Sequence, residues 1–283
     1  MKNLFKFTII LLLVIVNSVQ AQVKPSTATE RLNGLQKRKL LENDTTLNSI
    51  KFRNVGPSIM SGRVVDVDVN PTDPTEFYVA YATGGLWYTK NNGQSLVPVF
   101  DKENAIGIGD IAVDWTGYYE KGLIIPENKI RQIWVGTGEA NSSRSSYAGN
   151  GVYKSINNGK TWEYLGLPES QHIGKIILHP SNPNIAWVAV LGHLYSPSKE
   201  RGVYKTTDGG KTWKQTLFVD ENTGAVDMDI NPKNPDELYA GMWYRTRRAW
   251  NFEESGKTSG IYKSNDGGNT WKLVTAAGSG FPT

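Results

Sequence analysis

Short apolar runs, each bounded by Asn, Pro, Asp or Gly, follow one another along most of the chain. A Pro-containing turn joins them in pairs: Val64–Val69 with Phe77–Ala80, Ile176–Leu178 with Ile185–Val190, and Met228–Ile230 with Leu238–Ala240. A further pair, Ile111–Val113 and Ile133–Val135, is joined by a longer insert. Runs of this length, rich in Val, Ile and aromatic residues and ended by turn formers, predict β-strands.

The first residues differ from this pattern. Lys2 and Lys6 precede or flank the unbroken apolar run Phe7–Val16, and the small residue Ala21 offers a cleavage point. This arrangement predicts a signal peptide over residues 1–21, because a spanning helix needs about 20 apolar residues. We therefore expect an exported protein, secreted or held in a bacterial cell envelope, with no transmembrane segment in this chain. Residues 22–49 are polar and predict a linker with a short helix near 28–41.

One polar box recurs four times, with the template Ser/Thr-x-Asp/Asn-x-Gly-x-Thr/Ser-Trp. Its copies are Thr89–Leu96, Ser155–Trp162, Thr206–Trp213 and Ser264–Trp271. A Gly-apolar-aromatic triplet precedes each copy and predicts a third strand after each pair of apolar runs. Four antiparallel strands that recur as a unit are the signature of a propeller blade.

The box has a mechanical explanation. Its amide or carboxylate accepts hydrogen bonds within its own turn, its Gly supplies a positive φ, and its Trp packs between neighbouring sheets. We therefore assign structural roles, and no metal, to Asn91, Asn157, Asp208, Asp266, Trp162, Trp213 and Trp271. In the first copy Leu96 replaces the Trp.

The repeat predicts an all-β propeller over residues 50–283, with blades at about 55–100, 105–167, 172–218 and 224–275. A blade buries its faces against its neighbours, so a propeller must close or be capped. We expect an incomplete ring and further blades in a longer protein. A ring of four blades, or closure by association, is the alternative.

Composition narrows the chemistry. The 283 residues include no Cys and three His, which excludes disulfides and thiolate sites and leaves little for a His-based metal site. The net charge of +4 does not suggest a nucleic-acid partner. We expect neither a metal nor a cofactor.

The four boxes and the strands before them resemble the Asp-box (BNR) repeat propellers. That superfamily includes sialidases, tandem-propeller xyloglucanases, photosystem assembly factors and sortilin-type receptors. The segments Gly62–Asp66, Gly136–Glu139 and Gly202–Trp213 are similar to secreted bacterial proteins that carry a sortilin-type N-terminal propeller. Many such proteins are labelled glycosyl hydrolases by similarity.

Two departures from the enzymes of this superfamily stand out. The xyloglucanases have a catalytic Asp two residues before the Gly-Gly of the first blade, where this chain has Ala82. Sialidases have an early Arg-Ile-Pro segment, which is absent from this sequence. The resemblance therefore implies the fold and does not carry over either mechanism.

Functional residues of a propeller lie in the loops at one end of the blades. In the loops between second and third strands, Glu139 is the candidate acid or base, and a loop-bracing salt bridge is its alternative role. Glu253 or Asp66 could supply a second carboxylate. The candidate ligand-binding residues are Arg63, Arg144, His193, Trp243, Arg245, Arg247, Arg248 and Trp250. Arg and Trp together suit carboxylates and flat sugar faces, although the Arg could instead pair with Glu253 and Glu254.

We therefore predict a module that binds a peptide or a glycan through this loop face. A glycoside hydrolase with a carboxylate pair, or a structural part of a larger envelope protein, are the alternatives.

Overall fold

The computed structural model describes residues 26–50, 62–115, 131–144 and 146–280. The predicted signal peptide, residues 1–21, lies outside them. Most of the insert that joins Ile111–Val113 to Ile133–Val135 also lies outside.

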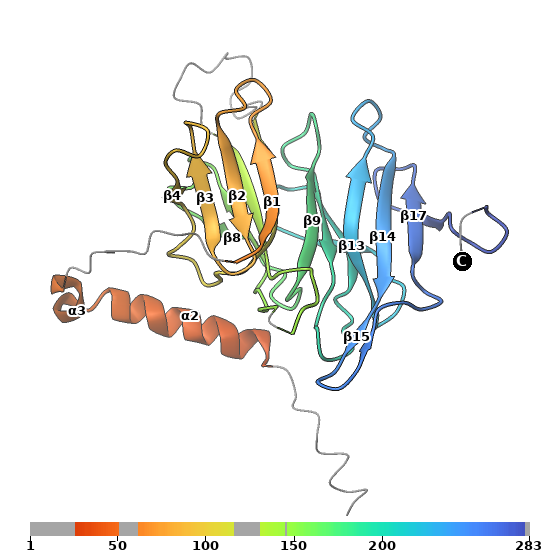
Figure 1. The fold of residues 1–283 in the computed structure, drawn as a ribbon, viewed down its shortest axis with the longest axis horizontal. Helices are drawn as coiled ribbons and strands as arrows, with labels where there is room; N and C mark the ends of the chain where they lie inside the picture. Colours follow the sequence, from red (N-terminus) through yellow and green to blue (C-terminus); the bar gives the residue numbers. More distant parts are fainter. Residues whose placement is uncertain (1–25, 51–61, 116–130, 145, 281–283) are drawn as a thin grey trace, which may run out of the picture.

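The described strands form four antiparallel sheets of four strands, which follow one another in chain order (Figure 1). The first contains β1 (Val64–Val69), β2 (Phe77–Tyr81), β3 (Gly85–Thr89) and β4 (Val97–Pro98); the second contains β5 (Ile108–Asp114), β6 (Gln132–Thr137), β7 (Val152–Ser155) and β8 (Glu163–Tyr164). The third contains β9 (Ile173–Leu178), β10 (Ala186–Val190), β11 (Gly202–Thr206) and β12 (Lys214–Leu217); the fourth contains β13 (Thr223–Ile230), β14 (Leu238–Tyr244), β17 (Gly260–Ser264) and β18 (Lys272–Leu273). The predicted all-β propeller of four-stranded blades, with an incomplete ring, is confirmed.

The first strand of each sheet joins that sheet to the next one. β1 contacts β5, β5 contacts β9, and β9 contacts β13. A register shift near the start of β1 and β5 places Asp66 and Asp110 at equivalent positions. The Asp66 carboxylate accepts the backbone N–H of Ile111 at 3.2 Å, and the Asp110 carboxylate accepts that of Ile176 at 2.7 Å. Each bulge therefore directs a carboxylate at the backbone of the following sheet.

In the three boxes that contain Trp, the indole connects its blade to the preceding one. The indole N–H of Trp162 donates to the carbonyl of Val99 at 2.7 Å, and that of Trp213 donates to the carbonyl of Leu165 at 2.8 Å. The ring of Trp213 also packs edge-on against Trp134 of the preceding blade, with centroids 6.2 Å apart. The core therefore lies between sheets, where the apolar second strands are buried on both faces.

The four boxes share one turn geometry. Side-chain oxygen Oδ1 of Asn91, Asn157, Asp208 and Asp266 accepts the backbone N–H four residues later, at 2.9–3.0 Å. The two residues that follow each of them have positive φ: Asn92 and Gly93, Asn158 and Gly159, Gly209 and Gly210, Gly267 and Gly268. Asn and Gly adopt this conformation at low cost, which explains their use at these two positions.

Two helices precede the sheets. α2 (Ala28–Glu42) begins with a capping box formed by Thr27 and Glu30, and α3 (Thr45–Ser49) follows it. The first turn of α2 is held by Glu169, which accepts the N–H of Ala28 at 2.5 Å and pairs with Arg31 at 3.2 Å. The helix therefore lies against the loops between successive blades, at the lower end of the sheets in Figure 1.

The carboxylates of the Asp boxes predict that the folded protein loses stability in acid. Hydrogen bonds from Thr212 lower the pKa of Asp208 to about 2, and those from Thr270 lower the pKa of Asp266 in the same way. A depressed folded-state pKa gives stability that is present above the ordinary carboxyl pKa, near 4, and is lost as the pH falls towards 2. We expect the double variant Asp208→Asn/Asp266→Asn to keep the turns, as Asn91 and Asn157 do. Its melting temperature should fall less than that of the native chain between pH 4 and pH 2.

The control for this measurement is Glu163→Gln, which neutralises an exposed acid outside the boxes. An acid profile of the double variant that coincides with the native profile would show that the box carboxylates do not set this sensitivity.

Candidate functional site

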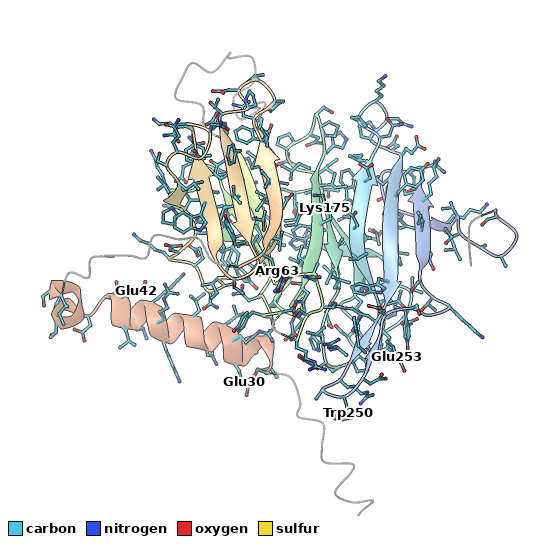
Figure 2. All side chains as sticks on the ribbon, in the orientation of Figure 1. Glu30, Glu42, Arg63, Lys175, Trp250 and Glu253 are labelled. Carbon is cyan, nitrogen blue, oxygen red and sulfur yellow. The ribbon has the colours of Figure 1, made fainter. Side chains whose placement is uncertain are left out.

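The candidate residues lie at the end of the sheets opposite the Asp boxes. Figure 2 places Arg63 beside the centre of this end and Trp250 with Glu253 at its far side. Trp250 is carried by a two-stranded hairpin, β15 (Thr246–Arg247) and β16 (Phe252–Glu253), which the fourth loop forms beyond β14. The site thus combines loops of all four blades.

Glu139 is fully buried and ion-paired. The guanidinium of Arg63 donates to both carboxylate oxygens, at 2.7 and 2.6 Å, and the hydroxyl of Ser146 donates to Oε2 at 3.0 Å. Burial opposes the charged form, but the hydrogen bonds from Arg63 and Ser146 outweigh it and hold the Glu139 pKa below its ordinary value. The carboxylate is therefore ionised at neutral pH, and its position matches a brace between the first and second blades.

His172 completes the environment of Glu139. Its Nδ1 lies 2.8 Å from the backbone carbonyl oxygen of Glu139, and its ring is buried. Burial, together with the nearby charges of Arg245 and Arg201, lowers the His172 pKa to about 3. The imidazole is therefore neutral at physiological pH, and its Nδ1 carries the proton that it donates to the carbonyl.

The third loop contributes His193, whose ring is half-buried between two polar partners. Its Nε2 lies 3.2 Å from Oε2 of Glu169, and its Nδ1 lies 3.0 Å from the hydroxyl of Ser196. Glu169 is the residue that also holds the start of α2. The side chain of Arg144 is exposed, and its backbone carbonyl accepts the hydroxyl of Tyr195 at 3.3 Å.

Aromatic residues organise the fourth loop. The indole N–H of Trp243 donates to the carbonyl of Glu254 at 2.6 Å, and its ring packs edge-on against Phe252. The guanidinium of Arg247 lies 4.4 Å from the centroid of Phe252. Trp250 stands apart from this packing, with 75% of its surface exposed. No ion pair joins Arg245, Arg247 or Arg248 to Glu253 or Glu254 in the described part of the chain.

Two arginines are buried in this region. Arg245 is 0% exposed, and one of its N–H groups contacts the hydroxyl of Ser142 in the second blade. Arg201 is 1% exposed and donates to the carbonyls of Asn222 at 3.0 Å and His193 at 2.8 Å. Both line a cavity of about 240 Å³ between the third and fourth loops, which Arg247, Arg248, Tyr195 and Glu253 also line.

Arg201 is absent from the sequence-derived set of candidates, although a signal for it exists. It precedes the Gly-apolar-aromatic triplet of the third blade, where the other blades have Gly84, Asn150 and Ser259. A charged residue at a position that is uncharged in the other repeats would have singled it out.

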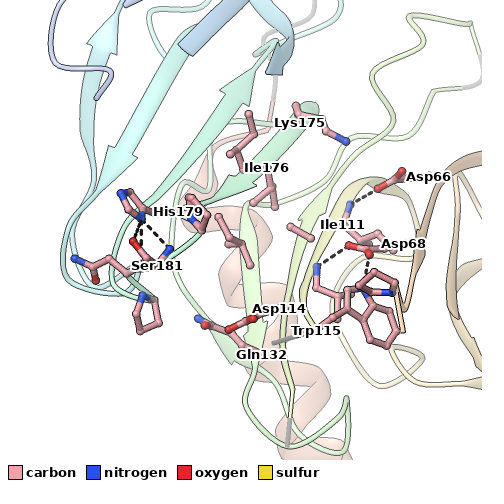
Figure 3. Close-up of a pocket in the computed structure, with 18 of the residues that line it drawn as sticks. Asp66, Asp68, Ile111, Asp114, Trp115, Gln132, Lys175, Ile176, His179 and Ser181 are labelled. Carbon is pink, nitrogen blue, oxygen red and sulfur yellow. Dashed lines mark hydrogen bonds between the residues drawn. The ribbon is translucent and has the colours of Figure 1, made fainter. Parts of the chain in front are cut away.

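A second hollow, of about 520 Å³, runs along the inner strands β1, β5 and β9 (Figure 3). Asp68 lies in it and accepts the indole N–H of Trp115 at 2.5 Å and the N–H of Val113 at 2.7 Å. Burial raises the Asp68 pKa to about 6 despite these bonds. Lys175, from β9, extends across the same wall and pairs with Asp110 at 3.0 Å. The hydrogen bonds of Asp68 join the first sheet to the second, and the Lys175–Asp110 ion pair joins the second sheet to the third.

Comparison with known proteins agrees with the propeller fold. Residues 150–281 match the family model Sortilin-Vps10, described as sortilin, neurotensin receptor 3. The resemblance to sortilin-type Asp-box propellers is confirmed. The vacuolar protein sorting/targeting protein 10 of Kluyveromyces lactis is 29% identical over 147 residues, which are 44% of this chain and 9% of that protein.

Enzymes also share the fold. A xyloglucanase of Hypocrea jecorina is 24% identical over 257 residues, which are 83% of this chain and 29% of the enzyme. The crystal structure of an ancestral GH74 enzyme superposes with a TM-score of 0.54 at 21% identity, over 77% of this chain and 26% of that one. The chain therefore spans less than a third of the length of these relatives. At this identity the structural likeness establishes the fold alone.

No helix among the described residues is long and apolar enough to cross a membrane.

The Arg63–Glu139 pair predicts a pH-dependent stability defect. Arg63→Met leaves the buried carboxylate without its main partner, so the melting temperature at pH 7 should fall by several degrees. Because the native Glu139 pKa lies below its ordinary value of 4.5, the native pair stabilises above that pH and loses its effect below it. The difference in melting temperature between native chain and variant should therefore narrow as the pH falls to 4 and below.

Lys211→Met, which removes a cation from a box loop at the other end of the sheets, serves as the control in the same thermal scans. A defect of Arg63→Met that is constant from pH 7 to pH 3 would mean that Arg63 contributes through packing and not through the ionised carboxylate.

Proposed function

We propose that this chain is an exported binding module that holds a glycan or a peptide against the loops opposite its Asp boxes. The observation that carries the proposal is the cavity between the third and fourth loops. Four arginines and one glutamate line it together with Tyr195, which is 50% exposed, and the exposed Trp250 lies on the adjoining hairpin. A concave site with charged groups inside and flat apolar faces outside suits a ligand that is partly charged and partly planar.

Glycoside hydrolysis is the second candidate, because a xyloglucanase is among the relatives. A hydrolase needs one carboxyl group that carries a proton and a second one about 5–9.5 Å away. Glu139 is ionised and enclosed by Arg63 and Ser146, and position 82 is an alanine. These features favour binding over hydrolysis.

Export rests on the charged and apolar pattern of residues 1–21, which is that of a signal peptide. We place the protein outside the cell or in the bacterial cell envelope.

Trp250→Ala tests the binding face. Because Trp250 is 75% exposed, its removal should leave the melting temperature unchanged. Loss of its ring should weaken ligand binding by about tenfold, which corresponds to about 1.4 kcal/mol of stacking energy. Binding to immobilised glycans and peptides measures the effect, and hydrolysis of plant and algal glycans by the native chain is assayed in parallel.

Ile156→Ala is the matched control, since Ile156 is exposed at the opposite end of the sheets, in a box turn. Equal binding by native chain and Trp250→Ala would exclude the hairpin from the site. Hydrolysis that Glu139→Gln abolishes would favour the enzyme instead.

The fourth sheet is the basis of a second proposal, that a further Asp-box blade covers it. Val152 and Val203, the apolar residues of the second and third triplets, are both 0% exposed, whereas Ile261 at the same position in the fourth blade is 38% exposed. Trp134 and Trp187 are buried beneath the next blade, and their counterpart Tyr239 is 38% exposed.

The lysines that lie over these aromatic rings differ in the same way between the internal sheets and the fourth sheet. Lys154 and Lys205 lie over Trp134 and Trp187 and donate to the box of the following blade. Lys263 lies over Tyr239 and pairs instead with Glu237 of its own sheet. The fourth sheet thus repeats the side chains of an internal sheet and presents them to solvent.

Appending a copy of residues 172–218 after Thr283 tests this proposal. The added blade should raise the melting temperature by several degrees, because stability in repeat proteins grows with each neighbour interface. Tyr239→Glu should remove that gain, measured against the unextended chain that carries the same substitution. A gain that survives Tyr239→Glu would show that the added blade does not pack on this face.

A further inference from the structure

The candidate site contains two buried arginines that form no ion pair with an acid of the described chain. Arg201 and Arg245 are both buried, and neither pairs with a carboxylate among the described residues. Nε and Nη2 of Arg245, and Nε of Arg201, are buried without an acceptor in the described part of the chain. The remaining N–H groups of Arg201 donate to uncharged carbonyl oxygens.

An arrangement of this kind is costly for the unliganded protein. A buried charge is normally paired, because desolvation of an unpaired ion costs far more than a neutral hydrogen bond returns. Burial lowers the pKa of Arg245, and the neighbouring charge of Arg201 lowers it further. Burial also lowers the pKa of Arg201, to about 10, although the charge of Asp220 opposes this shift. Two cations therefore lie close together in a place where each one disfavours the other.

The cavity beside them has the same imbalance. Arg247 and Arg248 add two more cations to its wall, and Glu253 is the acid that lines it. Glu253 is engaged in the hairpin, where its Oε2 accepts the hydroxyl of Thr246 at 3.0 Å. A planar guanidinium with free N–H groups binds a carboxylate or sulfate through two parallel hydrogen bonds.

The surroundings of the cavity indicate which kind of ligand would bring a carboxylate or sulfate group to these arginines. At about 240 Å³ the cavity is smaller than the 300–1,000 Å³ typical of a site for a whole small molecule, so it accommodates a charged group of a longer ligand. Tyr195 is 50% exposed on the cavity wall, and Trp250 is 75% exposed on the adjoining hairpin. Flat aromatic faces of this kind stack on sugar rings.

We infer that Arg201 and Arg245 form an oxyanion-binding centre, and that the ligand of this face is an acidic glycan whose uronate or sulfate group enters the cavity. This inference rests on the proposed binding function and deepens it, since a neutral polysaccharide would leave both guanidinium groups uncompensated.

Calorimetric titration of the native chain tests the ligand class with four probes: an oligogalacturonate, a sulfated galactan oligosaccharide, a neutral xyloglucan oligosaccharide of similar length, and a peptide with a free terminal carboxylate. At least one acidic glycan should bind ten or more times tighter than the neutral glycan and the peptide. Equal affinity for neutral and acidic glycans would overturn the oxyanion centre and leave the binding module standing. Tightest binding of the peptide would overturn the glycan.

Absence of binding by all four probes would count against the proposed function itself and would overturn this inference with it.

Arg245→Met tests the centre. It should weaken binding of the acidic glycan at least tenfold, while the melting temperature without ligand should stay the same or rise, because an unpaired buried charge is removed. A purely structural arginine would behave in the opposite way, with a lower melting temperature and unchanged affinity. Arg247→Met, at a half-buried position on the same wall, should weaken binding severalfold and serves if Arg245→Met does not fold. Arg38→Met, on α2, is the matched control and should leave affinity unchanged.

Discussion

The indoles of the second, third and fourth Asp boxes set the geometry on which the rest of the molecule depends. The second strands β6 and β10 are buried on both faces, so each of these sheets needs neighbours at a fixed distance and angle. Trp162 and Trp213 provide this by donating to the backbone of the preceding blade while their rings pack between the sheets. The donor is always the indole of the box, and the acceptor is a main-chain carbonyl for Trp162 and Trp213 and the hydroxyl of Thr216 for Trp271.

Placement of the box at one end brings the loops at the other end together. Asp66 and Asp110 hold the inner strands in register, and the opposite loops then meet across blades. Arg63 reaches Glu139 in the second blade, and Arg245 reaches Ser142 across 103 residues of sequence. The face is therefore a composite surface, and the polar residues that brace it, such as Glu139 and His172, are distinct from those that stay unpaired.

This distinction bears on how one propeller can serve both receptors and enzymes. Similar blades occur in a yeast sorting protein and in a fungal xyloglucanase, so the fold alone does not choose between binding and catalysis. Whether a propeller binds or catalyses depends on the ionisation of particular side chains and on whether a ligand can reach them. Here a carboxylate that could act as an acid is ionised and enclosed, whereas guanidinium groups border a cavity.

The sequence by itself determined the blades and their turns. Strand periodicity and box spacing are local properties, and a turn with two positive-φ residues needs Asn or Gly wherever it occurs, as at Asn92 and Gly93. The sequence also indicated where the loops would gather, because each follows the second strand of its blade. It left open which role Glu139 has.

The tertiary structure alone decided how the charges are distributed. Glu139 and Arg63 are 76 residues apart, and their pairing follows from the angle between two blades. Arg245 and Arg247 are two residues apart, and yet one is buried while the other lies half-exposed on an aromatic ring. Atoms from distant segments determine whether a charged side chain is buried and paired. The energy of the charge depends on this burial and pairing far more than on its neighbours in sequence.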